Sequence, residues 1–143
     1  MSDIAAEKTY EVITAGESAS FTVKITPELI HEFAEVSGDR NPLHVDDSYA
    51  RATSFGQRVS HGMIVGALFS RLIGMYLPGK YSVYLSQTLN FHKPVFVGAE
   101  VVIKGEVIHK TDSARSIVIR TIAEDARSGE MMVDGEAMVR LLK

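Results

Sequence analysis

Residues 61–76 would be apolar on nearly every side of a helix, and this segment restricts the possible folds more than any other feature. Ser60 is a good N-cap for such a helix, and Pro78-Gly79 would end it. A helix without a polar face has to be enclosed by the rest of the chain. Because Ser70 and Arg71 interrupt the apolar run, it is too short and too broken to span a membrane. We therefore predict a central core helix and no membrane partner.

Strand-like segments account for most of the remaining chain. Residues 18–25 alternate clearly, and residues 8–14 alternate loosely and could form an edge strand. Four more segments follow the core helix and are separated by short turn-forming joints: 81–91, 100–109, 114–124 and 130–142. Consecutive strands beside one enclosed helix predict an α+β fold in which an antiparallel sheet curls around the helix. No repeat or linker divides residues 1–143, so we expect a single domain, long enough to bury a core.

The chain before the core helix carries helix signals on both sides of a turn. Thr26-Pro27-Glu28 combines an N-cap, a first-turn proline and a carboxylate near the helix N-terminus. A helix should therefore run from there to about Ser37, with Gly38 ending it. A shorter helix is expected over residues 46–52, because either of the aspartates at its start can cap it.

The turn between these helices holds a carboxylate and an imidazole, Asp39 and His44, five residues apart. Pro42 prevents the two from sharing one regular helix. Adding water to a polarised double bond needs one group to take a proton from water and another to deliver a proton to the neighbouring carbon. A carboxylate and an imidazole around one water can do both. The structural alternative is that Asp39 hydrogen-bonds the loop backbone and His44 lies at the surface.

The start of the core helix is a second candidate site. Free N–H groups at a helix start stabilise developing negative charge, and Gly62 would let a carbonyl oxygen approach them, as in an oxyanion hole. Alternatively, His61-Gly62 is a tight helix start in which glycine serves packing alone. Ser70 could line a substrate tunnel or bond back to the Gly66 carbonyl. No base or nucleophile motif surrounds Ser70, so covalent catalysis by this serine is not expected.

Composition argues against several other classes of protein. The formal net charge of −3 gives no basic surface for nucleic acid, and the absence of cysteine excludes thiolate chemistry and disulfides. The histidines lack the spacing of a metal site, and no glycine-rich phosphate loop is present. We therefore expect no metal and no cofactor. The polar first ten residues contain no signal-peptide core, which favours a cytoplasmic protein.

Several blocks of the sequence resemble one family. Residues 33–44, FAEVSGDRNPLH, resemble the hydratase-2 motif of the MaoC-like, (R)-specific enoyl-CoA hydratases, which have the hot-dog fold. Further blocks agree with that family in order and spacing: VSHGM (59–63), ALFS (67–70), LPGK (77–80), YLSQ (84–87) and FHKPVFVG (91–98). The similarity is greatest to the short single-domain type that supplies (R)-3-hydroxyacyl-CoA for polyhydroxyalkanoate synthesis.

This resemblance implies roles for particular residues. Asp39 and His44 would form the catalytic dyad, and the Gly62 N–H would bind the thioester oxygen. Four further residues would lie near the substrate, the first of them fixing the loop and the last two bounding the acyl pocket: Asn41, Ser70, Ile73 and Met138. The resemblance also implies an acyl-CoA thioester as substrate, no metal or organic cofactor, and a homodimer whose sheets join edge to edge.

The activity implied is reversible syn addition of water to trans-2-enoyl-CoA, giving (R)-3-hydroxyacyl-CoA. We expect short acyl chains of about C4 to C6, since pocket walls tune chain length by only about 1–3 kcal/mol per methylene. Three alternatives stay open: an (R)-3-hydroxyacyl-carrier-protein dehydratase, an acyl-CoA thioesterase on the same scaffold, and a non-catalytic acyl-CoA-binding module. The sequence assigns neither the carrier nor the dyad member that acts as base.

Overall fold

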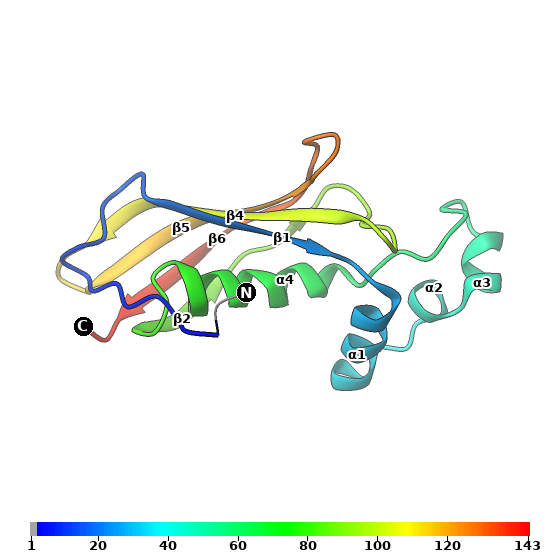
Figure 1. Cartoon of the computed structure of the whole chain (residues 1–143), viewed down its shortest axis with the longest axis horizontal. Helices are drawn as coiled ribbons and strands as arrows, with labels where there is room; N and C mark the ends of the chain where they lie inside the picture. The colour runs from blue at the N-terminus through cyan, green and yellow to red at the C-terminus, as the bar shows by residue number, and fades with distance from the viewer. Residues whose placement is uncertain (1–2) are drawn as a thin grey trace.

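A curved antiparallel sheet folds around one helix in the computed structural model, which describes residues 3–143 (Figure 1). The strand order is β1-β4-β5-β6-β2, with β3 also pairing with β6. The strands are β1 Ser18–Lys24, β2 Ser82–Gln87, β3 Asn90–Phe91, β4 Glu100–Thr111, β5 Ser116–Asp125 and β6 Met131–Leu141. This arrangement confirms the predicted α+β class and the sheet wrapped around a central helix.

The enclosed helix is α4, Gly62–Arg71, which continues as the π-helical segment η1, Leu72–Tyr76. Its apolar side chains pack against alternate residues of the long strands, whose other face is largely polar. The enclosed helix ends at Tyr76, where the sequence predicts its end. Its start differs, because His61 and not Ser60 is the N-cap. The Ser60 N–H donates to the Val95 carbonyl (2.7 Å), which ties this residue to the neighbouring loop and leaves its side chain buried.

Two predicted strand boundaries are wrong. Residues 8–14 form turns and not an edge strand, and Tyr10 and Ile13 instead cover one end of the core. Residues 81–91 divide into β2 and β3, with a break at Thr88. At this break a Cβ at Gly135 of β6 would lie only 1.8 Å from the Thr88 carbonyl oxygen, so the backbone of this stretch packs closely against β6.

Three short helices gather at one end of the molecule: α1 Pro27–Ser37, α2 Pro42–Val45 and α3 Asp47–Ala52 (Figure 1). The caps of α1 are as predicted, since Thr26 accepts from the Leu29 N–H (3.1 Å) and Gly38 adopts a left-handed φ of 76°. Helix α2 was not predicted. Pro42, which rules out one continuous helix, is itself the first residue of this new one. In the part of the chain described here, no helix combines the length and apolarity needed to cross a membrane.

Candidate active site

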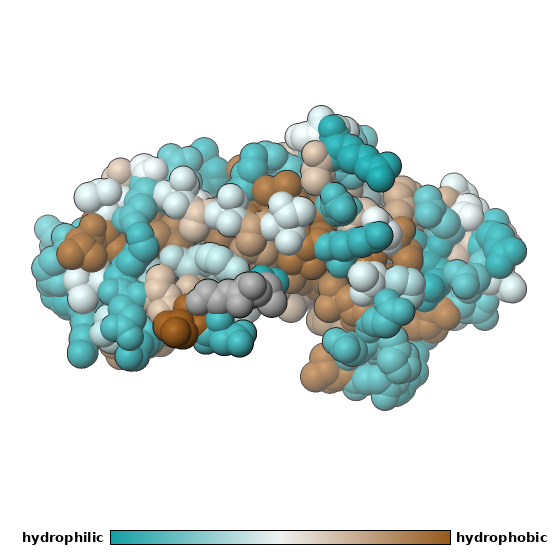
Figure 2. Space-filling view, viewed as in Figure 1, coloured by the Kyte–Doolittle hydropathy of each residue, from teal (hydrophilic) through white to brown (hydrophobic). Residues whose placement is uncertain are grey.

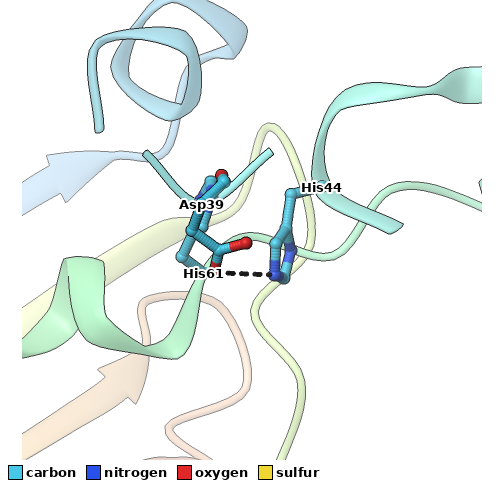
Figure 3. Close-up of side chains that lie close together, drawn as sticks. All are labelled: Asp39, His44 and His61. Carbon is cyan, nitrogen blue, oxygen red and sulfur yellow. Dashed lines mark hydrogen bonds and ion pairs between the residues drawn. The ribbon is translucent and has the colours of Figure 1, made fainter. Parts of the chain in front are cut away.

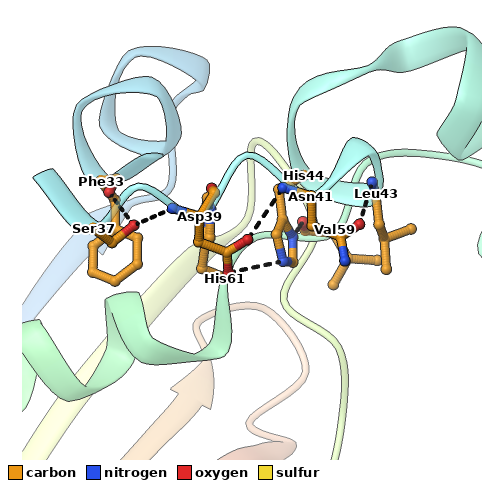
Figure 4. A network of polar contacts seen from close by, with 8 residues as sticks. All are labelled: Phe33, Ser37, Asp39, Asn41, Leu43, His44, Val59 and His61. Atoms are coloured by element: carbon orange, nitrogen blue, oxygen red, sulfur yellow. Dashed lines mark hydrogen bonds and ion pairs between the residues drawn. The ribbon is translucent and has the colours of Figure 1, made fainter. Parts of the chain in front are cut away.

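Local hydrogen bonds fix the loop that carries Asp39 between α1 and α2 (Figure 4). The Ser37 hydroxyl donates to the Phe33 carbonyl (2.7 Å) and accepts from the Asp39 N–H (3.1 Å). Asp39 Oδ1 accepts from the Asn41 N–H (3.1 Å), which closes an Asx turn. The backbone hydrogen bond of the structural alternative therefore does form. It uses one carboxylate oxygen and leaves Oδ2 available.

His44 is aimed by the short helix α2. The Asn41 side chain accepts from the Leu43 N–H (3.0 Å) and caps α2, and its predicted place in the substrate site stays a prediction. His44 Nδ1 lies 2.6 Å from the Val59 carbonyl oxygen. Because a carbonyl can only accept, Nδ1 carries the proton and Nε2 is free to face the site. The His44 side chain is only 15% exposed, so it is not the surface residue of the structural alternative.

Asp39 and His44 face each other across a gap that suits one water molecule (Figure 3). Asp39 Oδ2 lies 4.0 Å from His44 Nε2, which is longer than a direct hydrogen bond. A water oxygen about 2.8 Å from each atom can bridge this distance. The Asp39 side chain is 51% exposed, so water and substrate can reach it. This is the geometry that a general acid/base pair around one water requires.

Gly62 opens α4 beside the same site. The first turn of α4 has no side-chain cap, so the Gly62 N–H remains available to a ligand. Gly62 and His44 both line a cavity of about 450 Å³, whose other walls include Phe91 and Pro94. A Cβ at Gly62 would lie 2.7 Å from the Phe91 ring, so a larger residue here would force that ring to move. The packing interpretation of Gly62 therefore has structural support, and its role as an oxyanion donor stays a prediction.

Charged residues at the cavity mouth are already paired. His92 Nε2 lies 2.8 Å from Asp134 Oδ1, and this hydrogen bond holds the pKa of the Asp134 carboxyl below its usual value. Lys93 pairs with Glu130 (3.3 Å). A second hollow, of about 530 Å³, is lined by residues of β1, β4 and β5. None of Asp39, His44 and Gly62 lines this second hollow, so we place the candidate site at the cavity of about 450 Å³.

The remaining predicted site residues lie apart from this cavity within one chain. Ser70 is exposed on α4, whereas Ile73 is 1% exposed in the core next to Leu77. Met138 lies on β6 between two buried residues and is 43% exposed, so it points to the opposite face of the sheet. The chain alone does not bring Ile73 and Met138 into one acyl pocket. Their roles stay predictions.

His61 is a site residue whose contacts the sequence did not indicate. It is 2% exposed, its Nε2 lies 2.8 Å from the Asp39 carbonyl oxygen, and its ring centroid lies 4.0 Å from that of His44. The two contacts join residues 22 and 17 positions apart, so no local spacing announces them. The one sequence feature that could have drawn attention to His61 is its position beside Gly62 in the block at residues 59–63.

Asp39, His44 and His61 are also the residues that could hold a metal ion, since each offers one ligand atom within 4.8 Å of the others. Ligand atoms around tetrahedral Zn²⁺ would stand about 3.4 Å apart, given bonds of about 2.0–2.1 Å. His61 Nε2 already donates to the Asp39 carbonyl, and its Nδ1 is fully buried. These three donors therefore fit a metal only after rearrangement.

Comparison with known proteins identifies the family. The MaoC like domain matches residues 11–127 of this chain. The chain belongs to the MaoC-like family. One relative is the (R)-specific enoyl-CoA hydratase of Aeromonas caviae, 39% identical over 129 residues, which are 90% of this chain and 96% of that protein.

Solved structures of MaoC-like proteins agree with this assignment. The unliganded R-hydratase PhaJ1 from Pseudomonas aeruginosa has a TM-score of 0.91 at 37% identity, covering 96% of this chain and 87% of that one. The (R)-hydratase from A. caviae involved in PHA biosynthesis has a TM-score of 0.89 at 37% identity, covering 92% and 98%. The hot-dog fold expected from the resemblance is thereby confirmed.

Proposed function

We propose that this chain is an (R)-specific enoyl-CoA hydratase, a hydro-lyase that reversibly adds water to trans-2-enoyl-CoA to give (R)-3-hydroxyacyl-CoA. The observation that carries the proposal is the 4.0 Å separation of Asp39 Oδ2 and His44 Nε2 beside the cavity that His44 and Gly62 line. Membership of the MaoC-like family supports it.

In the proposed reaction, the Gly62 N–H donates to the thioester oxygen. This withdraws electrons from the double bond and makes C3 electrophilic, while the α4 dipole stabilises the charge that develops on the oxygen. Water between Asp39 and His44 attacks C3, and one dyad member takes its proton. That proton then passes from the dyad to C2 on the same face, so that one water adds in total and Asp39 and His44 return to their starting protonation. Reversal of these steps dehydrates the 3-hydroxyacyl thioester.

Both dyad members lie within reach of the same proposed water, so we assign the proton-accepting role to the pair and not to one residue. Negative charge spreads into the thioester during attack, and for that reason the reaction needs no metal or organic cofactor. EDTA-treated protein should accordingly keep its turnover. Loss of activity that added Zn²⁺ restores would contradict this part of the proposal.

We propose that the acyl group is carried by coenzyme A and that the acyl chain is short. We expect kcat/KM to peak at about C4 to C6 in a series of trans-2-enoyl-CoA substrates and to fall as methylenes are added. The same acyl groups on acyl carrier protein should react at least about tenfold more slowly. Faster turnover on the carrier protein would instead favour the (R)-3-hydroxyacyl-carrier-protein dehydratase, and a maximum at long chains would refute the short-chain pocket.

We further propose a homodimer joined through the edge strand β2. This strand lies at one edge of the sheet, and the side chain of Leu85 on it is 52% exposed. Met63 on α4 is a second large apolar residue that is exposed, at 55%. Apolar side chains are visible on the α4 side of the sheet in the middle of the molecule (Figure 2). A second copy covering α4 would enclose Ser70 and complete the acyl pocket.

Light scattering is expected to report a dimer for the unmodified protein and a monomer for Leu85→Asp, because the new charge would have to be buried in the interface. Val36→Asp is the matched control, since Val36 is 83% exposed on α1, away from β2. A monomeric unmodified protein, or equal effects of the two substitutions, would refute this interface.

The other two alternatives make different predictions. A thioesterase would release free thiol from saturated acyl-CoA, and a binding module would bind enoyl-CoA without turnover. The paired dyad around a water-sized gap favours hydration over both. A role in polyhydroxyalkanoate synthesis and a cytoplasmic location stay predictions.

A further inference from the structure

His61 makes contact with both members of the dyad. Its Nε2 lies 2.8 Å from the Asp39 backbone carbonyl oxygen. Its ring lies against the His44 ring, with centroids 4.0 Å apart and planes inclined by 31°, and the Phe33 ring covers it at 4.9 Å. The side chain is buried, and it is anchored to the first turn of α4. His61 therefore connects the loop of Asp39, the helix of His44 and the start of the core helix.

The hydrogen bond defines the tautomer of His61. The Asp39 carbonyl can only accept, so Nε2 carries the proton. His61 Nδ1 is buried and has no hydrogen-bond partner among residues 3–143. A second proton on Nδ1 would thus be a buried donor without an acceptor, which is costly. His44 has the opposite tautomer, since its Nδ1–H donates to the Val59 carbonyl.

These contacts restrain Asp39 without consuming its reactive oxygen. His61 holds the backbone carbonyl, and the Asn41 N–H holds Oδ1. Oδ2 is the oxygen that faces His44. The His61 ring, tilted by 31° against the His44 imidazole, restrains the plane of that ring as well, so both members of the dyad contact one buried side chain.

We propose that His61 is a positioning residue for the hydration reaction: its Nε2–H and its ring hold Asp39 and His44 at the separation that admits one water. The inference rests on the proposed function. His61 does not exchange protons with the substrate, because its Nε2 is engaged by a backbone carbonyl and its Nδ1 is inaccessible. A 1 Å displacement of a catalytic group can lower a rate by about 10²-fold, which is the scale expected when such a restraint is lost.

Two substitutions separate the donor from the ring. His61→Phe keeps an aromatic ring against His44 but removes the donor, whereas His61→Gln loses the ring and keeps an N–H the same number of bonds from Cβ. We expect His61→Phe to lower kcat for crotonyl-CoA hydration by about 10²-fold with KM changed by less than about threefold. His61→Gln should retain a kcat at least about tenfold above that of His61→Phe.

A role in packing alone predicts the reverse order, since phenylalanine fills the buried space better than glutamine. Wild-type kcat in His61→Phe, or a higher kcat in His61→Phe than in His61→Gln, would overturn the proposal. Both variants are compared at equal folded fractions, measured by circular dichroism and light scattering.

The tautomers provide a test that leaves His61 unchanged and does not need the proposed reaction to occur. Two-bond nitrogen–proton correlation spectra of ¹⁵N-histidine-labelled wild-type protein should show His61 as the Nε2–H tautomer and His44 as the Nδ1–H tautomer. Selective substitution of other histidines assigns the signals. An Nδ1–H tautomer at His61 would overturn the positioning contact, whereas absence of crotonyl-CoA turnover with the expected tautomers would overturn the proposed function alone.

Discussion

Asp39→Asn and His44→Gln are each expected to lower kcat for crotonyl-CoA hydration by about 10²–10⁴-fold, the usual contribution of a positioned acid or base. Asparagine still accepts from the Asn41 N–H and still presents a polar atom opposite His44, so the loop should survive while proton transfer does not. Initial rates at saturating crotonyl-CoA, together with KM, measure the effect. Because the two residues serve one water, the double variant should be little slower than either single variant.

Matched controls lie close to the dyad. Asp47→Asn alters a 66% exposed carboxylate that pairs with Arg58, and His31→Gln alters an exposed histidine on α1. Neither residue belongs to the proposed dyad or supplies the proposed oxyanion donor, so both variants should keep wild-type rates. A folded Asp39→Asn or His44→Gln protein with wild-type turnover would contradict the assignment of the dyad.

Removing the Gly62 N–H should have the second-largest effect. A direct substitution is confounded, because a Cβ at this position would lie 2.7 Å from the Phe91 ring. The comparison is therefore made in a Phe91→Ala background, which clears that space. There, Gly62→Ala keeps the N–H and Gly62→Pro removes it. Proline is tolerated at the first position of a helix, and His61, with ψ of 128°, has the extended backbone that a residue before proline needs.

We expect kcat/KM for crotonyl-CoA to be about 10²–10³-fold lower in the proline variant than in the alanine variant, the usual cost of one lost oxyanion donor. Gly74→Ala controls for added bulk on the same helix, since nothing lies within 4 Å of the Cβ it creates. Equal kcat/KM in the alanine and proline variants, with equal thermal stability, would show that the Gly62 N–H does not bind the thioester oxygen.

The parts of this fold that could be predicted are those that depend on local sequence patterns, such as helix caps and the distribution of apolar residues. The enclosed α4–η1 helix follows from its lack of a polar face, and Thr26 and Gly38 bound α1 through cap chemistry. The break at Thr88 was missed because it lies where the chain packs closely against Gly135, on a strand far along the chain. Local alternation continues through the break and gives no sign of it.

In the candidate site, too, local sequence predicts some residues and misses the contacts that depend on the tertiary fold. Asp39 and His44 are only five positions apart in the chain, so their proximity could be expected from the local sequence. The His61 contacts depend on how α4 enters the fold beside these two residues, which no spacing encodes. Ile73 and Met138 came from family resemblance alone. Within one chain, Ile73 is buried in the core on η1, whereas Met138 is exposed on β6, because residues on a strand alternate between core and exterior. A partner subunit is the remaining way to relate Met138 to the substrate.

The most direct test of hydration by one water held between Asp39 and His44 is the stereochemistry of addition in D₂O. The unmodified protein would convert crotonyl-CoA in D₂O, and nuclear magnetic resonance and chiral analysis would establish the configuration at C2 and C3 of the product. We predict a single diastereomer, with the (R) configuration at C3 and deuterium and hydroxyl added to the same face. An (S) product, anti addition or a mixture at C2 would contradict a dyad that delivers both parts of water from one side.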